Sequence, residues 1–224
     1  MPFDSLARFG RGGKIVEEQE KVEPIIDEEE IVAKTIRNRM SVRKYLDKDV
    51  SQDLVSRVLE ASRHTPSAGN YQPWEFIVVR DVNLKNDIVE ACYNQNWMKN
   101  APVFIVACMN CRLAGAVYGE RGLRLYGIQA VAAAIQNMLL SAQSMGLGTC
   151  WVGAFSEIVI SKIMQCPEYV RPCAIITLGY PDLGCTPHAK KHNKNEYIHY
   201  EKFGQTGQLK SVIEEKSPTF IKLE

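Results

Sequence analysis

Residues 126–145 read YGIQAVAAAIQNMLLSAQSM, a long helical pattern that is apolar almost all round. Ile128, Val131 and Ile135 recur at helical spacing, and no broad polar face separates them. A helix of this kind is normally buried. Gly146 follows where a left-handed helix end is expected. We therefore predict that this helix lies either at the centre of the core or in a subunit interface.

The segments around this helix are expected to alternate between helices and strands. Asp27 and Ser51 can cap helices, because their side-chain oxygens accept from unpaired N–H groups of the first turn. The helix after Ser51 must end before Pro66, since the residue preceding a proline is disfavoured in helical geometry. Further helices are expected at about residues 81–96 and 156–165, the latter capped by Ser156, and strands at about residues 74–80, 103–109, 149–155 and 174–178. The pattern predicts one mixed α+β domain.

Composition limits the function classes that fit. The chain has 224 residues, of which 46% are hydrophobic and 24% charged, as is usual for one soluble globular domain. A net charge of +1 gives no reason to expect nucleic-acid binding. No uninterrupted apolar run approaches the ~20 residues of a membrane span. The start of the chain lacks the layout of a secretory signal. We expect a cytoplasmic protein with seven reduced cysteines.

The two ends differ in composition from the rest of the chain. Residues 1–27 are predicted to be a solvated N-terminal arm, because the segment that follows Val16 is acid-rich. Residues 28–192 are expected to hold the folded domain. Residues 193–224 are polar and show little periodicity, so they are predicted to be an extension that packs on a partner subunit.

Cys108 and Cys111 have C-x-x-C spacing, which is found in metal and redox sites. No second C-x-x-C is present to complete a zinc site, and the pair follows an apolar strand-like run. We favour a structural role, and a metal-binding protein is kept as an alternative. The four histidines, His64, His188, His192 and His199, occur in no recognisable catalytic motif, so we expect surface roles for them.

Three stretches carry chemistry. The first, Arg39-Met40-Ser41-Val42-Arg43, places two arginines and a hydroxyl at a spacing of two. In an extended segment these three side chains share one face, and guanidinium groups bind phosphate bidentately. A basic helix end that complements its own dipole is the competing interpretation of this stretch taken alone.

The second stretch is Pro66-Ser67-Ala68-Gly69-Asn70-Tyr71-Gln72-Pro73-Trp74, and the third is residues 146–155, GLGTCWVGAF. Ser67 and Asn70 can hydrogen-bond ribityl hydroxyls or the edge of a flavin. Gly153 and Ala154 are small, and they precede a helix start, so a flat ring could approach the backbone closely there. Ordinary turn chemistry would explain either stretch alone.

In combination and in this order, the three stretches, followed by Leu178-Gly179-Tyr180-Pro181, resemble the FMN-dependent nitroreductase family over residues 31–192. The resemblance implies a central mixed, mainly antiparallel sheet flanked by helices, in an intertwined homodimer with FMN at the subunit interface. It further implies FMN contacts from these residues: Arg39, Met40, Ser41, Arg43, Gly153 and Ala154, with Pro66, Ser67 and Asn70 reaching from the other subunit. Lys190 and Lys191 are expected near the phosphate, with His192 as a third candidate. Gln129 is a candidate contact only.

The resemblance implies an oxidoreductase in which FMN carries the chemistry, so no catalytic side chain is required. NAD(P)H would be the transient donor of a ping-pong cycle, and nitroaromatics, quinones or activated alkenes would be acceptors. Trp97, Tyr118 and Tyr126 could stack on a planar substrate, although core packing explains them equally well. The alternatives are a reductive dehalogenase resembling iodotyrosine deiodinase, whose substrate lid would lie within residues 93–124, a flavin-fragmenting enzyme, and a non-enzymatic flavin-binding module.

Overall fold

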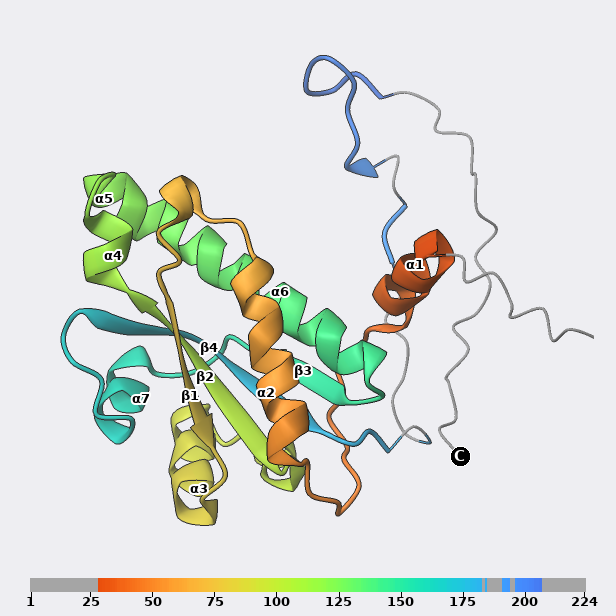
Figure 1. Ribbon diagram of the computed structural model, residues 1–224, viewed down its shortest axis with the longest axis vertical. Helices are drawn as coiled ribbons and strands as arrows, with labels where there is room; N and C mark the ends of the chain where they lie inside the picture. The colour runs from red at the N-terminus through yellow and green to blue at the C-terminus, as the bar shows by residue number, and fades with distance from the viewer. Residues whose placement is uncertain (1–27, 183, 185–190, 194–195, 207–224) are drawn as a thin grey trace, which may run out of the picture.

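The computed structural model describes residues 28–182, 184, 191–193 and 196–206. In this part of the chain, four strands form one antiparallel sheet in the order β1-β2-β4-β3, with helices on both faces (Figure 1). The strands are β1 (Trp74–Val79), β2 (Val103–Asn110), β3 (Gly148–Val152) and β4 (Val170–Gly179). An isolated parallel bridge joins Ser41 to Thr149 beside this sheet. The α+β class and the mainly antiparallel sheet are confirmed.

The helices precede, connect and follow these strands along the chain. The α-helices are α1 (Glu28–Asn38), α2 (Gln52–Glu60), α3 (Val82–Ala91), α4 (Cys111–Gly115), α5 (Gly119–Arg121), α6 (Gly127–Ser144) and α7 (Glu157–Ile163). Short 3-10 turns are η1 (Ala61–His64), η2 (Ala68–Asn70) and η3 (Asn96–Asn100), and η4 (Gly122–Tyr126) is a π-helical turn. The helical turns of α4, α5 and η4 were not expected from the sequence.

Strand β2 lies at the centre of the fold. Residues 103–109 are at most 1% exposed, and their side chains alternate between two hydrophobic layers. Ile105 and Met109 pack with α2 and α6 on one face, whereas Phe104 and Val106 pack with α3 and α7 on the other. A fully buried side chain of this size contributes about 1.5–3 kcal/mol. The sheet is therefore covered on both faces.

Helix α6 packs along one face of this sheet (Figure 1). Val131, Ile135 and Met138 are almost wholly buried against it, which confirms the central helix predicted from the sequence. The helical run Gly119–Ser144 is long and apolar enough, by length and composition alone, to cross a membrane, with a mean hydropathy of 1.2 over an 18-residue window. Its buried residues belong to the hydrophobic core of the domain, and this packing explains why the run is apolar.

Of the predicted helix caps, that of Ser51 is confirmed, Asp27 lies outside the described residues, and Asp81 is a further cap that was not predicted. The side chains of Ser51 and Asp81 accept from the N–H groups of Leu54 and Leu84 at 3.3 and 2.9 Å. Ser156 precedes α7 as expected, but its side chain makes no capping hydrogen bond. Gly146 has φ +72°, the predicted left-handed helix end.

Three boundaries differ from the sequence expectations, and the first is the end of β3, which stops at Val152 rather than near residue 155. Helix α3 ends at Ala91 rather than near residue 96, because Tyr93 and Asn94 adopt positive φ angles of 55° and 57°. Strand β4 begins at Val170, before Pro172, which lacks an N–H for the ladder. The ladder tolerates this proline because the register between β2 and β4 shifts at residues 107 and 108.

Several thiols are buried, and burial raises their pKa. The pKa of Cys92 rises from 9.0 to about 12 and that of Cys173 to about 11. Burial also raises the pKa of Cys108 and Cys111, the C-x-x-C pair. Both thiols are therefore poor nucleophiles in the folded protein.

These shifts predict that the fold is destabilised by alkali. A thiol whose folded pKa is raised contributes stability that is fully present below about pH 9, where neither state ionises, and that is lost as the pH rises toward the folded pKa. Burial lowers the pKa of Lys85, so this group makes the stability rise with pH instead. It is a single group, whereas several thiols act in the other direction. We expect a melting temperature that is flat from about pH 7 to 8.5 and falls above about pH 9.

The measurement is differential scanning calorimetry across this pH range. In Cys92→Ala, the melting temperature should fall less steeply with pH, even though the cavity lowers stability at every pH. An identical slope in the variant and the parent protein would show that Cys92 does not contribute.

Candidate functional site

The Arg39–Arg43 stretch is an extended segment held against the end of the sheet. The N–H of Val42 donates to the carbonyl of Thr149 at 2.8 Å, and Ser41 forms a parallel bridge with the same residue. Val42 is 2% exposed, so its side chain faces the core. Ser41 is half-buried and Arg43 is exposed. Ser41, Val42 and Arg43 therefore show the alternation expected of an extended segment. Arg39 directly follows α1, as the helix-end interpretation expected, and its N–H donates to the carbonyl of Thr35 at 3.1 Å.

The charges of this segment are not neutralised by acidic side chains in the described part of the chain. No ion pair is formed by Arg39 or Arg43 there. The guanidinium of Arg43 lies over the Trp97 ring at 5.6 Å, a cation–π contact. One five-residue segment thus carries two guanidinium groups without an acidic partner in the described residues and one hydroxyl, a set of donors that suits a phosphate.

Cys150 lies beneath this segment. Burial raises the pKa of the Cys150 thiol. Three influences act to lower this pKa: the charge of Arg43, a hydrogen bond with Ser41, and the charge of Arg39. Both arginines thus act electrostatically on the same buried thiol. The first and third stretches are therefore brought together, with Cys150 of the third below the first.

The end of the third stretch is open to solvent. Gly153 and Ala154 are exposed, and a Cβ placed on Gly153 would meet nothing nearer than Trp151 Nε1 at 4.0 Å. The carbonyl of Ala154 accepts from Gln95 Nε2 at 3.1 Å. Gln95 also donates to the carbonyl of Cys92, which ties this turn to the end of α3. Gln95 carries no sequence signal of its own, because a lone glutamine in a turn forms no pattern.

The second stretch is a tight loop with its own internal hydrogen bonds. Ser67 Oγ accepts from the N–H of Gln72 at 3.0 Å, and Gln72 Nε2 donates to Asn70 Oδ1 at 3.1 Å. Gly69, Asn70 and Gln72 have φ angles of +59°, +56° and +49°. Such conformations cost about 1–3 kcal/mol for a non-glycine residue and cluster at functional sites. Pro66 and Asn70 are exposed.

This loop is not brought to the arginines of its own chain. Ala68 and Tyr71 pack beside Gly127 and Ala130, at the start of α6. Ser41 pairs with Thr149, in the strand that follows the end of α6. Helix α6 has 18 residues and is therefore about 27 Å long. The two groups of predicted site residues lie at opposite ends of this helix (Figure 1).

The remaining predicted contacts are placed as follows. Gln129 is exposed in the first turn of α6, at the end that carries the second stretch. Lys191 and His192 are exposed, and His192 Nδ1 lies 3.4 Å from Glu196 Oε2. Lys190 and His188 lie outside the described residues. Trp97 contacts Arg43, whereas the rings of Tyr118 and Tyr126 meet edge to face near the second stretch, with their centres 5.2 Å apart.

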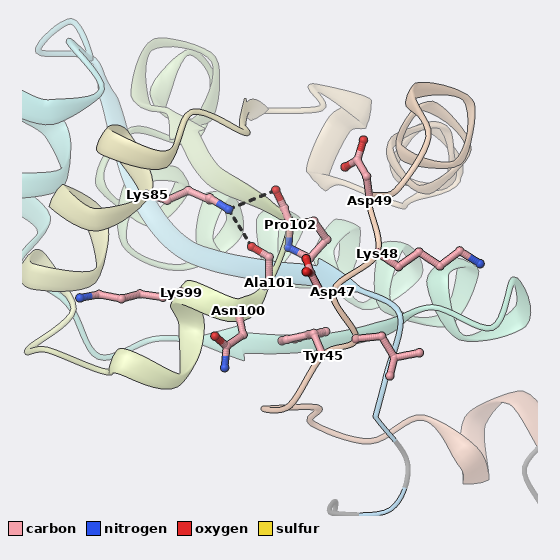
Figure 2. A pocket seen from close by; sticks show the side chains of 10 residues that line it. Tyr45, Asp47, Lys48, Asp49, Lys85, Lys99, Asn100, Ala101 and Pro102 are labelled. Atoms are coloured by element: carbon pink, nitrogen blue, oxygen red, sulfur yellow. Dashed lines mark hydrogen bonds between the residues drawn. The ribbon is translucent and has the colours of Figure 1, made fainter.

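A cavity of about 360 Å³ is lined by residues that include Tyr45, Lys85 and Pro102 (Figure 2). Lys85 is 9% exposed, and its Nζ donates to the carbonyls of Ala101 and Pro102 at 3.0 and 3.4 Å. Burial lowers the pKa of Lys85, whereas Asp49 acts to raise it. Its ammonium is thus engaged by backbone carbonyls, which braces the start of β2 on α3. We interpret this cavity as part of the scaffold.

Comparison with known proteins identifies the family. The profile of the Nitroreductase family matches residues 36–97 and 89–180, so the chain belongs to this family. It is 36% identical to a Methanothermobacter thermautotrophicus protein described as a candidate NADH dehydrogenase/NAD(P)H nitroreductase, over 67% of this chain and 77% of that protein. It is 30% identical to the FMN reductase (NAD(P)H) of Bacillus subtilis, over 67% and 66% of the two chains.

A solved structure agrees with this membership. A candidate NADH dehydrogenase/NAD(P)H nitroreductase from Parabacteroides distasonis superposes with a TM-score of 0.67 at 29% identity. The match covers 77% of this chain and 98% of that one. The fold predicted from the three stretches is confirmed.

The anchoring of the Arg39–Arg43 segment generates a stability prediction. The buried hydroxyl of Tyr45 donates to the carbonyl of Val42 or to Thr177 Oγ1, at 2.8 and 2.7 Å. Tyr45→Phe removes the hydroxyl and leaves buried acceptors unpaired. We expect the free energy of unfolding to fall by about 1–2 kcal/mol in urea denaturation. Tyr93→Phe, at an exposed tyrosine, is the matched control and should leave stability unchanged. Equal stability of the two variants would contradict the anchoring role.

Proposed function

We propose that this protein is an NAD(P)H-dependent FMN oxidoreductase that reduces nitroaromatics, quinones or related acceptors. The observation that carries the proposal is the group formed by Arg39, Ser41 and Arg43, whose guanidinium charges are unpaired in the described part of the chain. Family membership and relatives named as FMN reductases support the same cofactor.

The residues present fit an FMN. Arg39, Ser41 and Arg43 offer guanidinium and hydroxyl donors to a phosphate. The open backbone at Gly153 leaves room for a flat ring. The N–H groups of Gly153 and Ala154 lie just before α7 and are candidate donors to the ring. Met40 lies within the same extended segment. We propose Lys190 and Lys191 as further phosphate contacts.

Bound FMN would supply the hydride and electron chemistry between NAD(P)H and the acceptor. The protein's part is to bind, orient and shield. The donor is proposed to bind and leave before the acceptor enters, which gives ping-pong kinetics. No side chain is proposed to take part as an acid or base.

A second subunit is proposed to complete each site. The loop with Pro66, Ser67 and Asn70 lies beside the start of α6 and the arginine segment lies beyond its end, so the two ends of one chain do not form one site. Helix α1 also exposes Ile31, Val32 and Ile36, each more than half exposed. An apolar face of this kind is typical of an interface. Gln129 is proposed to contribute from the same end as the loop.

The compartment is proposed from thiol chemistry. The six cysteines in the described residues are free. Free thiols are typical of proteins in a reducing compartment, so we propose the cytoplasm.

The first test is reduction of the FMN-loaded protein. We expect anaerobic NADH or NADPH to bleach the flavin absorbance, because the family's donors reduce the bound cofactor. Addition of a nitroaromatic or a quinone should restore it. The measurement is an absorbance titration under argon. A flavin that stays oxidised with both donors would falsify the oxidoreductase and leave a flavin-binding module.

The second test concerns the phosphate contact. Arg43→Ala removes one charge-assisted hydrogen-bond partner, worth about 1.5–3 kcal/mol, so the FMN dissociation constant should rise at least about tenfold. Fluorescence titration of the apoprotein with FMN measures it. Arg57→Ala is the control, because Arg57 is exposed on α2 and pairs with Asp53. Unchanged affinity in Arg43→Ala would remove Arg43 from the site.

A further inference from the structure

A cluster of tyrosines borders the second stretch. The rings of Tyr71 and Tyr118 meet edge to face at 6.4 Å, and those of Tyr118 and Tyr126 at 5.2 Å. Tyr71 and Tyr118 remain 37% and 39% exposed. Gly69 lies directly under them, since a Cβ there would come within 2.6 Å of the Tyr71 ring and 3.2 Å of the Tyr118 hydroxyl. The tyrosine cluster is therefore built onto the loop that is proposed to reach the FMN.

The cluster carries one fixed positive charge. Arg121 Nε donates to the Tyr126 hydroxyl at 2.7 Å, and its guanidinium lies 5.1 Å from the centre of the same ring. In the described part of the chain, no acidic side chain forms an ion pair with Arg121. The neighbouring Arg124, by contrast, pairs with Glu120 at 2.6 Å. Arg121 thus presents an unneutralised guanidinium beside exposed aromatic rings.

The backbone holds this arrangement in place. Residues 122–126 form the π-helical turn η4, and such turns are frequent at functional sites. Gly122 packs closely against the carbonyl of Ala114, which leaves no space for a side chain. The hollow beneath the rings is only about 10 Å³, too small for a ring. The exposed parts of Tyr71 and Tyr118 are therefore the surfaces that a ligand can contact.

We propose that the tyrosine cluster and Arg121 form an acceptor subsite that selects planar aromatic molecules carrying a carboxylate or another anionic group. The exposed rings offer edge and face contacts to an aromatic acceptor. The guanidinium of Arg121 offers charge-assisted hydrogen bonds to its anionic substituent. Tyr126 is the positioning residue that orients Arg121. This inference rests on the proposed function, because it concerns the acceptor of that same site.

The test compares two acceptors of nearly the same shape, 4-nitrobenzoate and 4-nitrobenzamide, with the FMN-loaded protein. In Arg121→Gln, the KM for 4-nitrobenzoate should rise about tenfold, because one charge-assisted contact is lost. The KM for 4-nitrobenzamide should change by less than about twofold, since a neutral acceptor gains little from the charge. Arg124→Gln is the matched control and should alter neither KM, because Arg124 is engaged by Glu120.

Tyr126→Phe separates positioning from charge. It keeps the ring and removes the hydroxyl that accepts from Arg121, so the KM for 4-nitrobenzoate alone should rise about threefold. An equal loss with both acceptors in Arg121→Gln would show a general structural effect and overturn the proposal. An effect on the KM of NAD(P)H alone would also overturn it, because the charge would then serve the phosphates of the donor.

Isothermal titration calorimetry with 4-nitrobenzoate, in the absence of donor, decides the question without turnover. Binding about tenfold weaker to Arg121→Gln than to the parent protein supports the subsite. Equal affinity, or no binding to either protein, overturns it. If the parent protein turns over no acceptor at all, the proposed function fails, whereas the calorimetric comparison still tests Arg121.

Discussion

The rest of this structure depends on the burial of strand β2 on both faces. Its side chains alternate between two hydrophobic layers, and residues 103–109 are almost wholly excluded from solvent. β2 pairs with β1 on one side and β4 on the other, so a shift by one residue would exchange the two layers. This register fixes β4, which in turn fixes β3. Thr149 of β3 then holds the segment that carries Arg39 and Arg43.

The same architecture explains why the candidate site is divided. Helix α6, about 27 Å long, packs along the sheet, with the arginine segment near one end and the loop with Ser67 and Asn70 near the other. Different contacts hold the two segments in place. The arginine segment is anchored by the buried hydroxyl of Tyr45 and by backbone pairing, whereas the loop is held by internal hydrogen bonds and positive φ angles. A second copy of the chain can bring opposite ends together.

Much of the fold was predictable because its signals are local. The cap at Ser51, the turn at Gly146 and the buried helix around Ile135 each follow from neighbouring residues. The boundaries of α3 and β4 were missed, since they depend on positive φ angles and on a shifted strand register. The helical turns of residues 111–126 were missed as well. Their close packing depends on contacts between residues apart in sequence, such as Gly122 with Ala114.

By itself, the sequence determined the α+β class, the family resemblance and the identity of the three stretches, because each is a matter of local pattern and order. Only the tertiary structure decided which residues meet. It brought Arg43 to Trp97 and Cys150, tied Ala154 to Gln95 and placed Tyr71 against Tyr118. It also left Arg121 beside Tyr126 without an acidic partner in the described residues. The physical reason is that charge pairing and stacking depend on distances across the fold, which residue spacing along the chain does not specify.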